Sequence, residues 1–175
     1  MKSICLMGVG NVLMHDDALG PYVLESLKAK YDLPPEVTVF DAGTPGLDLT
    51  LFLVEFDALI AVDALKGQGA PGEVKTYTRA QLLEGALPIT MSPHEPTLRE
   101  ALMRMALLGK GPSEVLLVGA IPEVVKTGTG LSPRVRDAVP RIEEHILREL
   151  LRLGARVAPR VSRREPDLWW ERPAA

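Results

Sequence analysis

Apolar residues recur in two different periods along this chain, and the two periods alternate from its first residues to about residue 154. Short apolar runs predict strands at residues 3–9, 37–41, 58–64, 73–78 and 114–120. Apolar residues at steps of three and four predict helices at residues 18–30, 46–54, 79–84, 96–108 and 133–153. Because strands and helices alternate, we expect an α/β fold with one doubly wound, mostly parallel, five-stranded sheet and helices on both faces.

Two parts of the chain depart from this alternation. The loop at residues 67–72 is short and rich in Gly and Pro, so it cannot hold a crossover helix. The strand that follows it, at 73–78, is therefore predicted to be an antiparallel edge strand. Residues 155–175 show no periodicity, and we expect a single α/β domain over residues 1–154 followed by a loosely ordered tail.

Composition narrows the range of functions. The chain has 175 residues, of which 46% are hydrophobic and 25% charged, as in an ordinary globular protein with its own core. A net charge of −3 gives no electrostatic basis for binding nucleic acid. No apolar run approaches the roughly 20 residues that span a bilayer. No signal-peptide pattern follows Met1, so we expect a cytoplasmic protein.

Polar side chains are concentrated where the predicted strands end, which is where ligands bind in a doubly wound sheet. The first strand runs into a glycine turn, Gly8-Val9-Gly10, followed by His15-Asp16-Asp17. Asp41 ends the second strand, Asp63 ends the third, and His94 precedes the helix at 96–108. Acids at the ends of apolar strands are costly to bury without a role or a partner.

Each of these residues also has a structural interpretation. We expect Asp16 or Asp17 to cap the first helix, where a carboxylate accepts backbone N–H bonds, and the other acid to be left free. Asp41 fits a bond to the turn amides after it as well as it fits a functional role. Taken alone, His94 is most simply a surface histidine. His15 is either solvated or a support for the aspartates. The single cysteine, Cys5, lies within a strand and reads as a buried structural thiol.

A sharper hypothesis joins three of these residues. Asp17, Asp63 and His94 supply two carboxylates and one imidazole, a donor set that suits a divalent metal ion if the fold brings them together. Competing motifs are incomplete. Gly8-x-Gly10-x-x-Leu13 lacks the third glycine of a dinucleotide site, and the segment that begins at His94-Glu95 lacks the second histidine of a zinc-protease helix.

Taken together, the segments resemble the nickel–iron hydrogenase maturation endopeptidases. The similar pieces occur in the family's order, and they are Gly8-Val9-Gly10-Asn11-Val12-Leu13, Asp16-Asp17, Asp41-x-Gly43-Thr44-x-Gly46, Ile60-Ala61-Val62-Asp63-Ala64, Pro71-Gly72, Ser92-Pro93-His94, Gly119-x-x-Pro122 and Gly130-Leu131-Ser132-Pro133. The tail from about residue 155 lies outside this resemblance.

The resemblance implies an endopeptidase that removes the C-terminal extension of a hydrogenase large-subunit precursor after nickel insertion. It further implies that Asp17, Asp63 and His94 contact the nickel and form the catalytic site, although some relatives have Glu at the position of Asp17. We expect the nickel to be supplied by the substrate, with no tightly held cofactor. Asp41 is a candidate either to support a metal ligand by a hydrogen bond or to act as the base, and Asp16 is expected to be a local structural partner.

Two other function classes stay open at this point. A non-catalytic metal-site chaperone of the same fold would bind the precursor and leave its mass unchanged. A hydrolase with its own zinc at the same cluster would purify with stoichiometric metal. A nucleotide-binding domain is disfavoured because the third glycine is missing and two acids follow the turn.

Overall fold

The computed structural model describes residues 2–43, 49–84, 89–91 and 95–172, with no side-chain detail at 89–91 and 95–97. Its main sheet has the strand order β3-β1-β4-β7-β5. The bounds of these strands are β3 Val37–Gly43, β1 Ile4–Val9, β4 Ala58–Gly67, β7 Glu114–Ala120 and β5 Val74–Thr78. The first four are parallel to one another, and β5 pairs antiparallel with β7 at one edge. The predicted sheet and its antiparallel edge strand are confirmed.

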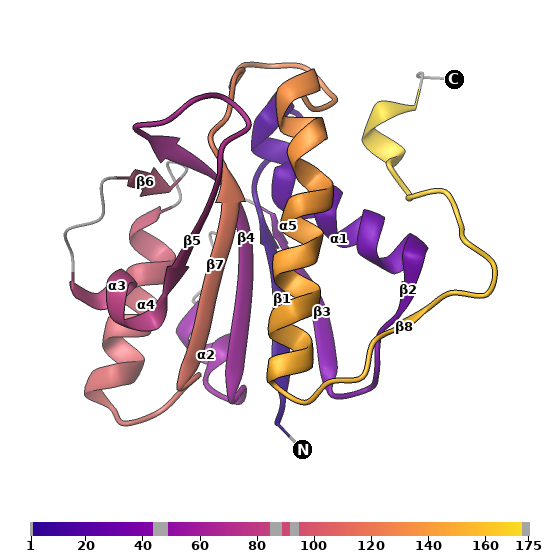
Figure 1. The fold of residues 1–175 in the computed structure, drawn as a ribbon. Coiled ribbons are helices and arrows are strands. Elements are labelled where there is room, and N and C mark those ends of the chain that lie inside the picture. The colour runs from indigo at the N-terminus through magenta and orange to yellow at the C-terminus, as the bar shows by residue number, and fades with distance from the viewer. Residues whose placement is uncertain (1, 44–48, 85–88, 92–94, 173–175) are drawn as a thin grey trace.

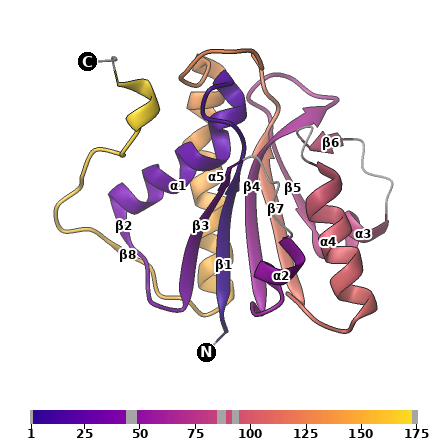
Figure 2. The same cartoon turned by 180° about the vertical axis from the view of Figure 1, so that it is seen from behind.

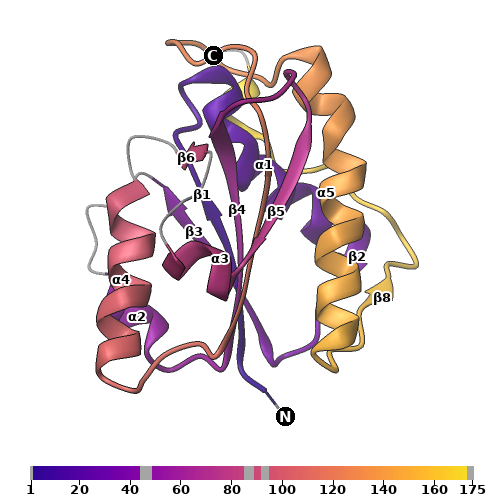
Figure 3. The ribbon, with the colours of Figure 1, turned by 60° about the vertical axis from the view of Figure 1, so that its left-hand side comes forward.

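Helices cover both faces of this sheet, as Figure 3 shows from the side. One face carries α1 (Leu19–Lys30) and α5 (Pro133–Arg152), with α5 in front of the sheet in Figure 1. The other face carries α2 (Leu49–Leu53) and α4 (Glu95–Leu107), seen in front in Figure 2, with α3 (Arg79–Glu84) beside them. All five predicted helices are present.

Alternation along the strands divides the core between these two helical layers. In β4, Ile60 and Val62 pack into the cluster formed with α1 and α5, while Leu59 and Ala61 pack into the cluster formed with α2 and α4. This strand is buried on both sides, which is why it reads as a continuous apolar run. Cys5 lies in the second cluster, and burial raises the pKa of its thiol to about 12.

Glycine residues allow the backbone at the start of α1 to contact the sheet directly. A Cβ atom at Gly20 would lie 2.3 Å from the Val9 carbonyl oxygen and 2.6 Å from that of Val62, so only glycine allows this approach. Gly10 has φ of +137°, and a Cβ there would lie 1.7 Å from the Asp17 carbonyl oxygen. The glycine turn therefore allows the short 3₁₀ helix η1 (His15–Ala18) to pack closely against the end of the sheet.

The structure adds strands that the hydrophobic pattern did not predict. Strand β4 continues three residues past its predicted end, and its last part pairs antiparallel with β6 (Ile89–Met91). The short strands β2 (Tyr31–Asp32) and β8 (Ala158–Pro159) pair with each other away from the main sheet. Among the described residues, every helix is too short or too polar to cross a membrane.

Residues 155–172 differ from the expected loosely ordered tail. Besides pairing through β8, this segment ends in the 3₁₀ helix η2 (Trp169–Glu171), where Trp170 is buried. Arg160 fixes the segment to the end of α1, because its Nε donates to the carbonyl oxygens of Lys28 at 2.8 Å and Tyr31 at 3.2 Å. Hydrogen bonds to main-chain carbonyls and a single buried ring produce no periodic pattern of apolar residues. The sequence therefore did not predict that this segment is ordered.

Candidate functional site

Asp17 lies in η1 at the carboxyl end of the sheet, with its side chain 3% exposed. One carboxylate oxygen, Oδ2, accepts a hydrogen bond of 2.9 Å from the backbone N–H of Asn11. The other oxygen, Oδ1, is buried and has no hydrogen-bond partner among the described residues. A buried carboxylate oxygen without a donor is costly, so this atom is suited to an electropositive group that comes from outside the described chain.

Asp16, its neighbour, has the opposite environment. It is fully buried, and its two oxygens accept four hydrogen bonds of 2.6–2.9 Å, from the backbone N–H groups of Glu123, Val124 and Ser132 and from the Ser132 hydroxyl. Asp16 therefore joins η1 to the loop at residues 121–132, which runs between β7 and α5.

The expectation that one of these acids caps the first helix is wrong. Helix α1 begins after η1 without a side-chain hydrogen bond at its N-cap, Ala18. The intervening 3₁₀ turn directs Asp17 back to Asn11 and Asp16 across to the loop. Asp16 is structural, as expected, but its partners lie more than 100 residues away in sequence and are not local.

Asp63 lies in β4 just past the point where that strand stops pairing with β1, whose last partner is Val62. Its side chain is 1% exposed, and its Oδ1 accepts a hydrogen bond of 2.7 Å from the Ala64 N–H. By alternation with Leu59 and Ala61 it belongs to the sheet face that carries α2 and α4. Helix η1 packs against β4, so Asp17 and Asp63 occupy the same edge of the sheet.

His94 lies outside the described residues, as do Ser92 and Pro93. The chain is described on either side of that stretch. Met91 pairs with Leu65, two residues after Asp63, and α4 begins at Glu95. Among the described residues, no group of three His, Cys, Asp or Glu side chains could hold a metal ion. The predicted site of Asp17, Asp63 and His94 thus stays a prediction.

The remaining candidates have structural partners. His15 has an unusual φ of +48°, and its Nδ1 lies 3.1 Å from the Gly130 carbonyl oxygen, which must accept, so Nδ1 carries the proton of this bond. Asp41 is exposed, and its Oδ1 accepts a bond of 2.9 Å from the Gly43 N–H, as its turn interpretation predicted.

Sequence reasoning missed the loop that supports this edge. Its contacts to η1 are made largely by backbone groups, such as the His15 N–H that donates to the Gly128 carbonyl at 2.9 Å and the Gly128 N–H that donates to Leu13. Any residue can supply a backbone N–H group, so the residue types of the loop do not predict these contacts. The sequence signal for them was the buried acid Asp16, which accepts hydrogen bonds from the loop.

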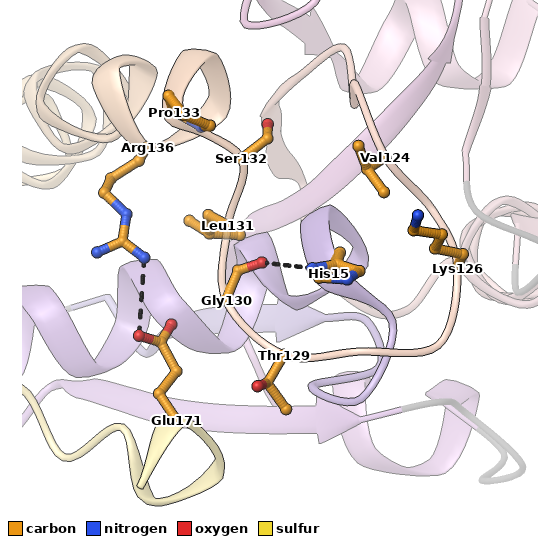
Figure 4. A pocket seen from close by; sticks show the side chains of 10 residues that line it. All are labelled: His15, Val124, Lys126, Thr129, Gly130, Leu131, Ser132, Pro133, Arg136 and Glu171. Carbon is orange, nitrogen blue, oxygen red and sulfur yellow. Dashed lines mark hydrogen bonds and ion pairs between the residues drawn. The ribbon is translucent and has the colours of Figure 1, made fainter. Parts of the chain in front are cut away.

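A pocket of about 600 Å³ adjoins η1 on the side of this loop. Figure 4 shows its lining, in which Glu171 of η2 faces Arg136 of α5 across from the loop at Gly130. The ten lining residues are His15, Val124, Lys126, Thr129, Gly130, Leu131, Ser132, Pro133, Arg136 and Glu171. Ser132 also donates to Asp16, so the pocket shares a wall with the turn that carries Asp17.

Comparison with known proteins identifies the family. A family model for hydrogenase maturation proteases matches residues 21–149, well over half of the chain. The chain belongs to the hydrogenase maturation protease family. The resemblance seen in the sequence is thereby confirmed, and the chain is an endopeptidase of hydrogenase maturation.

Individual relatives agree with this assignment. The protease is 33% identical over 158 residues to the hydrogenase 2 maturation protease of Escherichia coli K12, covering 90% of this chain and 96% of the relative. It is 33% identical over 137 residues to the hydrogenase expression/formation protein HupD of Bradyrhizobium diazoefficiens, covering 78% and 71%. The solved structure of the hydrogenase maturating endopeptidase HybD from E. coli superposes with a TM-score of 0.80 at 32% identity, covering 91% and 98%.

Proposed function

We propose that this protease removes the C-terminal extension of a nickel–iron hydrogenase large-subunit precursor and recognises the nickel already held by that precursor. Asp17, Asp63 and His94 contact the metal and form the catalytic site. In this proposal the nickel belongs to the substrate, and the protease needs no tightly held cofactor of its own.

The observation that carries the proposal is that Asp17 Oδ1, buried at the same end of the sheet as Asp63, has no hydrogen-bond partner in the part of the chain that the structure describes. Burying two carboxylates at the same end of the sheet is costly, and a divalent cation bound there would offset that cost. Carboxylate oxygens together with an imidazole nitrogen form a donor set that nickel accepts.

The position of His94 along the chain supports the third ligand. The described chain on one side of it, at Met91, pairs with β4 two residues beyond Asp63. On the other side α4 begins, and α4 packs on the face of the sheet to which Asp63 belongs. These flanking contacts are the support for His94 as the third ligand.

Three protein ligands make an incomplete coordination shell, and this has a functional consequence. In this proposal the site binds a free ion less tightly than an ion whose remaining ligands come from the substrate, because the substrate completes the coordination shell. Recognition then tests whether the precursor is loaded with metal. The nickel also supplies a Lewis acid near the peptide bond. Asp41 is the candidate residue to accept a proton from the attacking water.

The direct test is mass spectrometry of a purified precursor before and after incubation with this protein. A nickel-loaded precursor should lose the mass of a C-terminal peptide, and the same precursor without nickel should keep its mass. Equal cleavage of both forms would refute recognition through the metal, and no cleavage of the loaded form would refute the proposed activity.

Variants test the residues within the same assay. Asp17→Asn and Asp63→Asn should each lower the processing rate at least about a hundredfold, because each replaces a charged metal ligand by a neutral amide. His94→Ala should do the same. Asp137→Asn, a change at an exposed acid on α5, is the matched control and should process at the wild-type rate. Circular dichroism confirms that each variant is folded.

A further inference from the structure

The hydroxyl group of Ser132 does not do what a serine at its position usually does. Ser132 is the N-cap residue of α5, with φ of −58° and ψ of 154°, and its side chain makes no capping hydrogen bond to that described helix. A serine N-cap normally accepts a bond from a backbone N–H of the first turn. Here the hydroxyl donates to Asp16 Oδ2 at 2.9 Å instead. A departure from a local preference is expected where a residue serves a functional site.

This bond is half of a two-point contact between α5 and η1. The Ser132 backbone N–H donates to the other carboxylate oxygen of Asp16, Oδ1, at 2.6 Å. Asp16 is fully buried, and its Oδ2 also accepts bonds of 2.8 Å from the Glu123 and Val124 N–H groups. The carboxylate lies at the positive end of a 20-residue helix, which attracts a negative charge. The start of α5 thus holds Asp16 in place, and η1 with it.

The orientation of Asp17, the next residue, depends on where η1 is held. Its carboxylate accepts a hydrogen bond of 2.9 Å from the N–H of Asn11, which lies in the turn that leads into η1. Its Oδ1 has no partner in the described chain. The bond from Asn11 fixes the carboxylate relative to its own turn, and the contacts of Asp16 fix that turn relative to α5. A movement of η1 therefore moves Asp17.

We propose that Ser132 is a positioning residue, which acts through Asp16 to hold the carboxylate of Asp17 in the orientation that peptide cleavage requires. The inference rests on the proposed function, in which Asp17 contacts the metal, and it adds a residue of α5 that does not touch the substrate's metal. Partners that orient a metal ligand from behind affect metal affinity or activity about 10–100-fold. A displacement of about 1 Å at a reacting group has a similar effect on rate.

The hydroxyl can be removed without removing the other connections of η1. The His15 N–H donates to the Gly128 carbonyl at 2.9 Å, and the Gly128 N–H donates to that of Leu13 at the same distance. Asp16 would also keep its three backbone donors after loss of the Ser132 hydroxyl. We therefore expect the loop to stay packed against η1 while Asp16 moves toward its remaining donors and displaces Asp17.

The first measurement compares two substitutions in the cleavage of a nickel-loaded precursor. Ser132→Ala removes the hydroxyl and should lower kcat about tenfold, with KM within about twofold of the wild type. Ser132→Thr keeps the hydroxyl and should retain kcat within about twofold. Ser132 lines the pocket beside η1, so the added methyl group has space. Rescue by threonine would show that the hydroxyl is the required feature.

The second measurement needs no substrate, because the Asn11 amide reports on Asp17. An amide proton that donates to a carboxylate resonates downfield of a free amide proton. In nuclear magnetic resonance spectra of the nickel-free protease, the Asn11 amide proton should shift upfield in Ser132→Ala, as its bond to Asp17 Oδ2 weakens. It should stay at the wild-type position in Ser132→Thr.

A matched control removes another serine hydroxyl far from η1. Ser113 is exposed just before β7, at the opposite end of the strands, and its hydroxyl donates to the Asp57 carbonyl at 3.4 Å. Ser113→Ala should leave kcat, KM and the Asn11 resonance unchanged. Thermal unfolding verifies that each variant is folded. If Ser132→Ala does not fold, Ser132→Cys, with a thiol as the weaker donor, takes its place and should lower kcat to a smaller extent.

The outcomes separate this inference from the proposed function. If the wild type cleaves the loaded precursor and Ser132→Ala cleaves it with the same kcat, the positioning role is overturned and the proposed function stands. If the wild type fails to cleave, the proposed function fails, and the Asn11 resonance decides on the positioning role alone. Equal loss of kcat in Ser132→Ala and Ser132→Thr, or a lower kcat with an unchanged Asn11 resonance, would also overturn the inference.

Discussion

The two adjacent acids of η1 should respond in opposite ways to the same substitution. Asp16 is fully buried and accepts four hydrogen bonds, whereas Asp17 accepts one and has a buried oxygen without a partner among the described residues. Replacing each acid by asparagine keeps its size and removes its charge. The pair thus tests whether hydrogen bonding or burial alone decides what a buried carboxylate contributes to stability.

In Asp16→Asn, the amide oxygen can replace only one of the two carboxylate oxygens. If it takes the place of Oδ2, the amide NH₂ faces the Ser132 N–H, which donates to Oδ1 at 2.6 Å in the wild type. One charge-assisted bond is lost to a contact between two donors, and the other three lose the charge. Since bonds to charged groups contribute about 1.5–3 kcal/mol each, we expect a loss of about 3 kcal/mol.

In Asp17→Asn, the amide oxygen can keep the bond from Asn11 while the NH₂ replaces the unpartnered Oδ1. The change removes a buried charge and breaks no hydrogen bond among the described residues. We therefore expect the free energy of unfolding to stay within about 1 kcal/mol of the wild type, or to rise.

Urea unfolding followed by circular dichroism measures both values. A loss of about 3 kcal/mol corresponds to a decrease in Tm of about 6–12 °C for a chain of this length. Hydrogen exchange adds a local measurement, because the Glu123, Val124 and Ser132 amides should lose protection in Asp16→Asn only. Equal destabilisation by the two variants, or an unchanged Asp16→Asn, would refute this account of the edge.

Three further predictions follow from the described contacts. Because burial raises the pKa of Cys5 to about 12, iodoacetamide at pH 8 should label the folded chain at least about 1,000-fold more slowly than the unfolded chain; comparable rates would show that the thiol is accessible. Arg160→Ala should cost about 1–2 kcal/mol in urea unfolding and speed hydrogen exchange of the Arg164 amide, which donates to Ala29 at 3.1 Å; unchanged exchange would mean that the tail is held elsewhere. Bonds from the cations of Lys2 and Arg152 lower the pKa of Glu114, so its contribution to stability is present above the carboxyl's unfolded pKa of about 4.3 and is lost as the pH falls through the lower folded value. The Tm difference between Glu114→Gln and the wild type should therefore shrink between pH 6 and pH 3, and a difference independent of pH would contradict the assignment.

Much of the fold could be predicted because it is encoded locally. The buried run at residues 58–62 and the periodic positions of α5 identify elements whose apolar surface must be covered, and alternating strands and helices allow few topologies. The short loop at 67–72 was enough to predict an antiparallel edge, since a parallel connection needs more residues. The same sequence could not reveal β6, because three residues carry no measurable period.

The candidate site, like the fold, could be predicted from the sequence only in part. The sequence by itself determined that Asp17 and Asp63 fall at the carboxyl edge of the sheet, since strand ends in a parallel sheet meet there. Only the tertiary structure decided that Asp16 holds the loop at 121–132, that Asp17 has a buried oxygen without a partner among the described residues, and that Glu171 lines a pocket beside η1. These facts depend on backbone donors and on contacts between residues more than 100 positions apart. A hydrophobic pattern records which residues are buried, and it holds no information on which atom meets which.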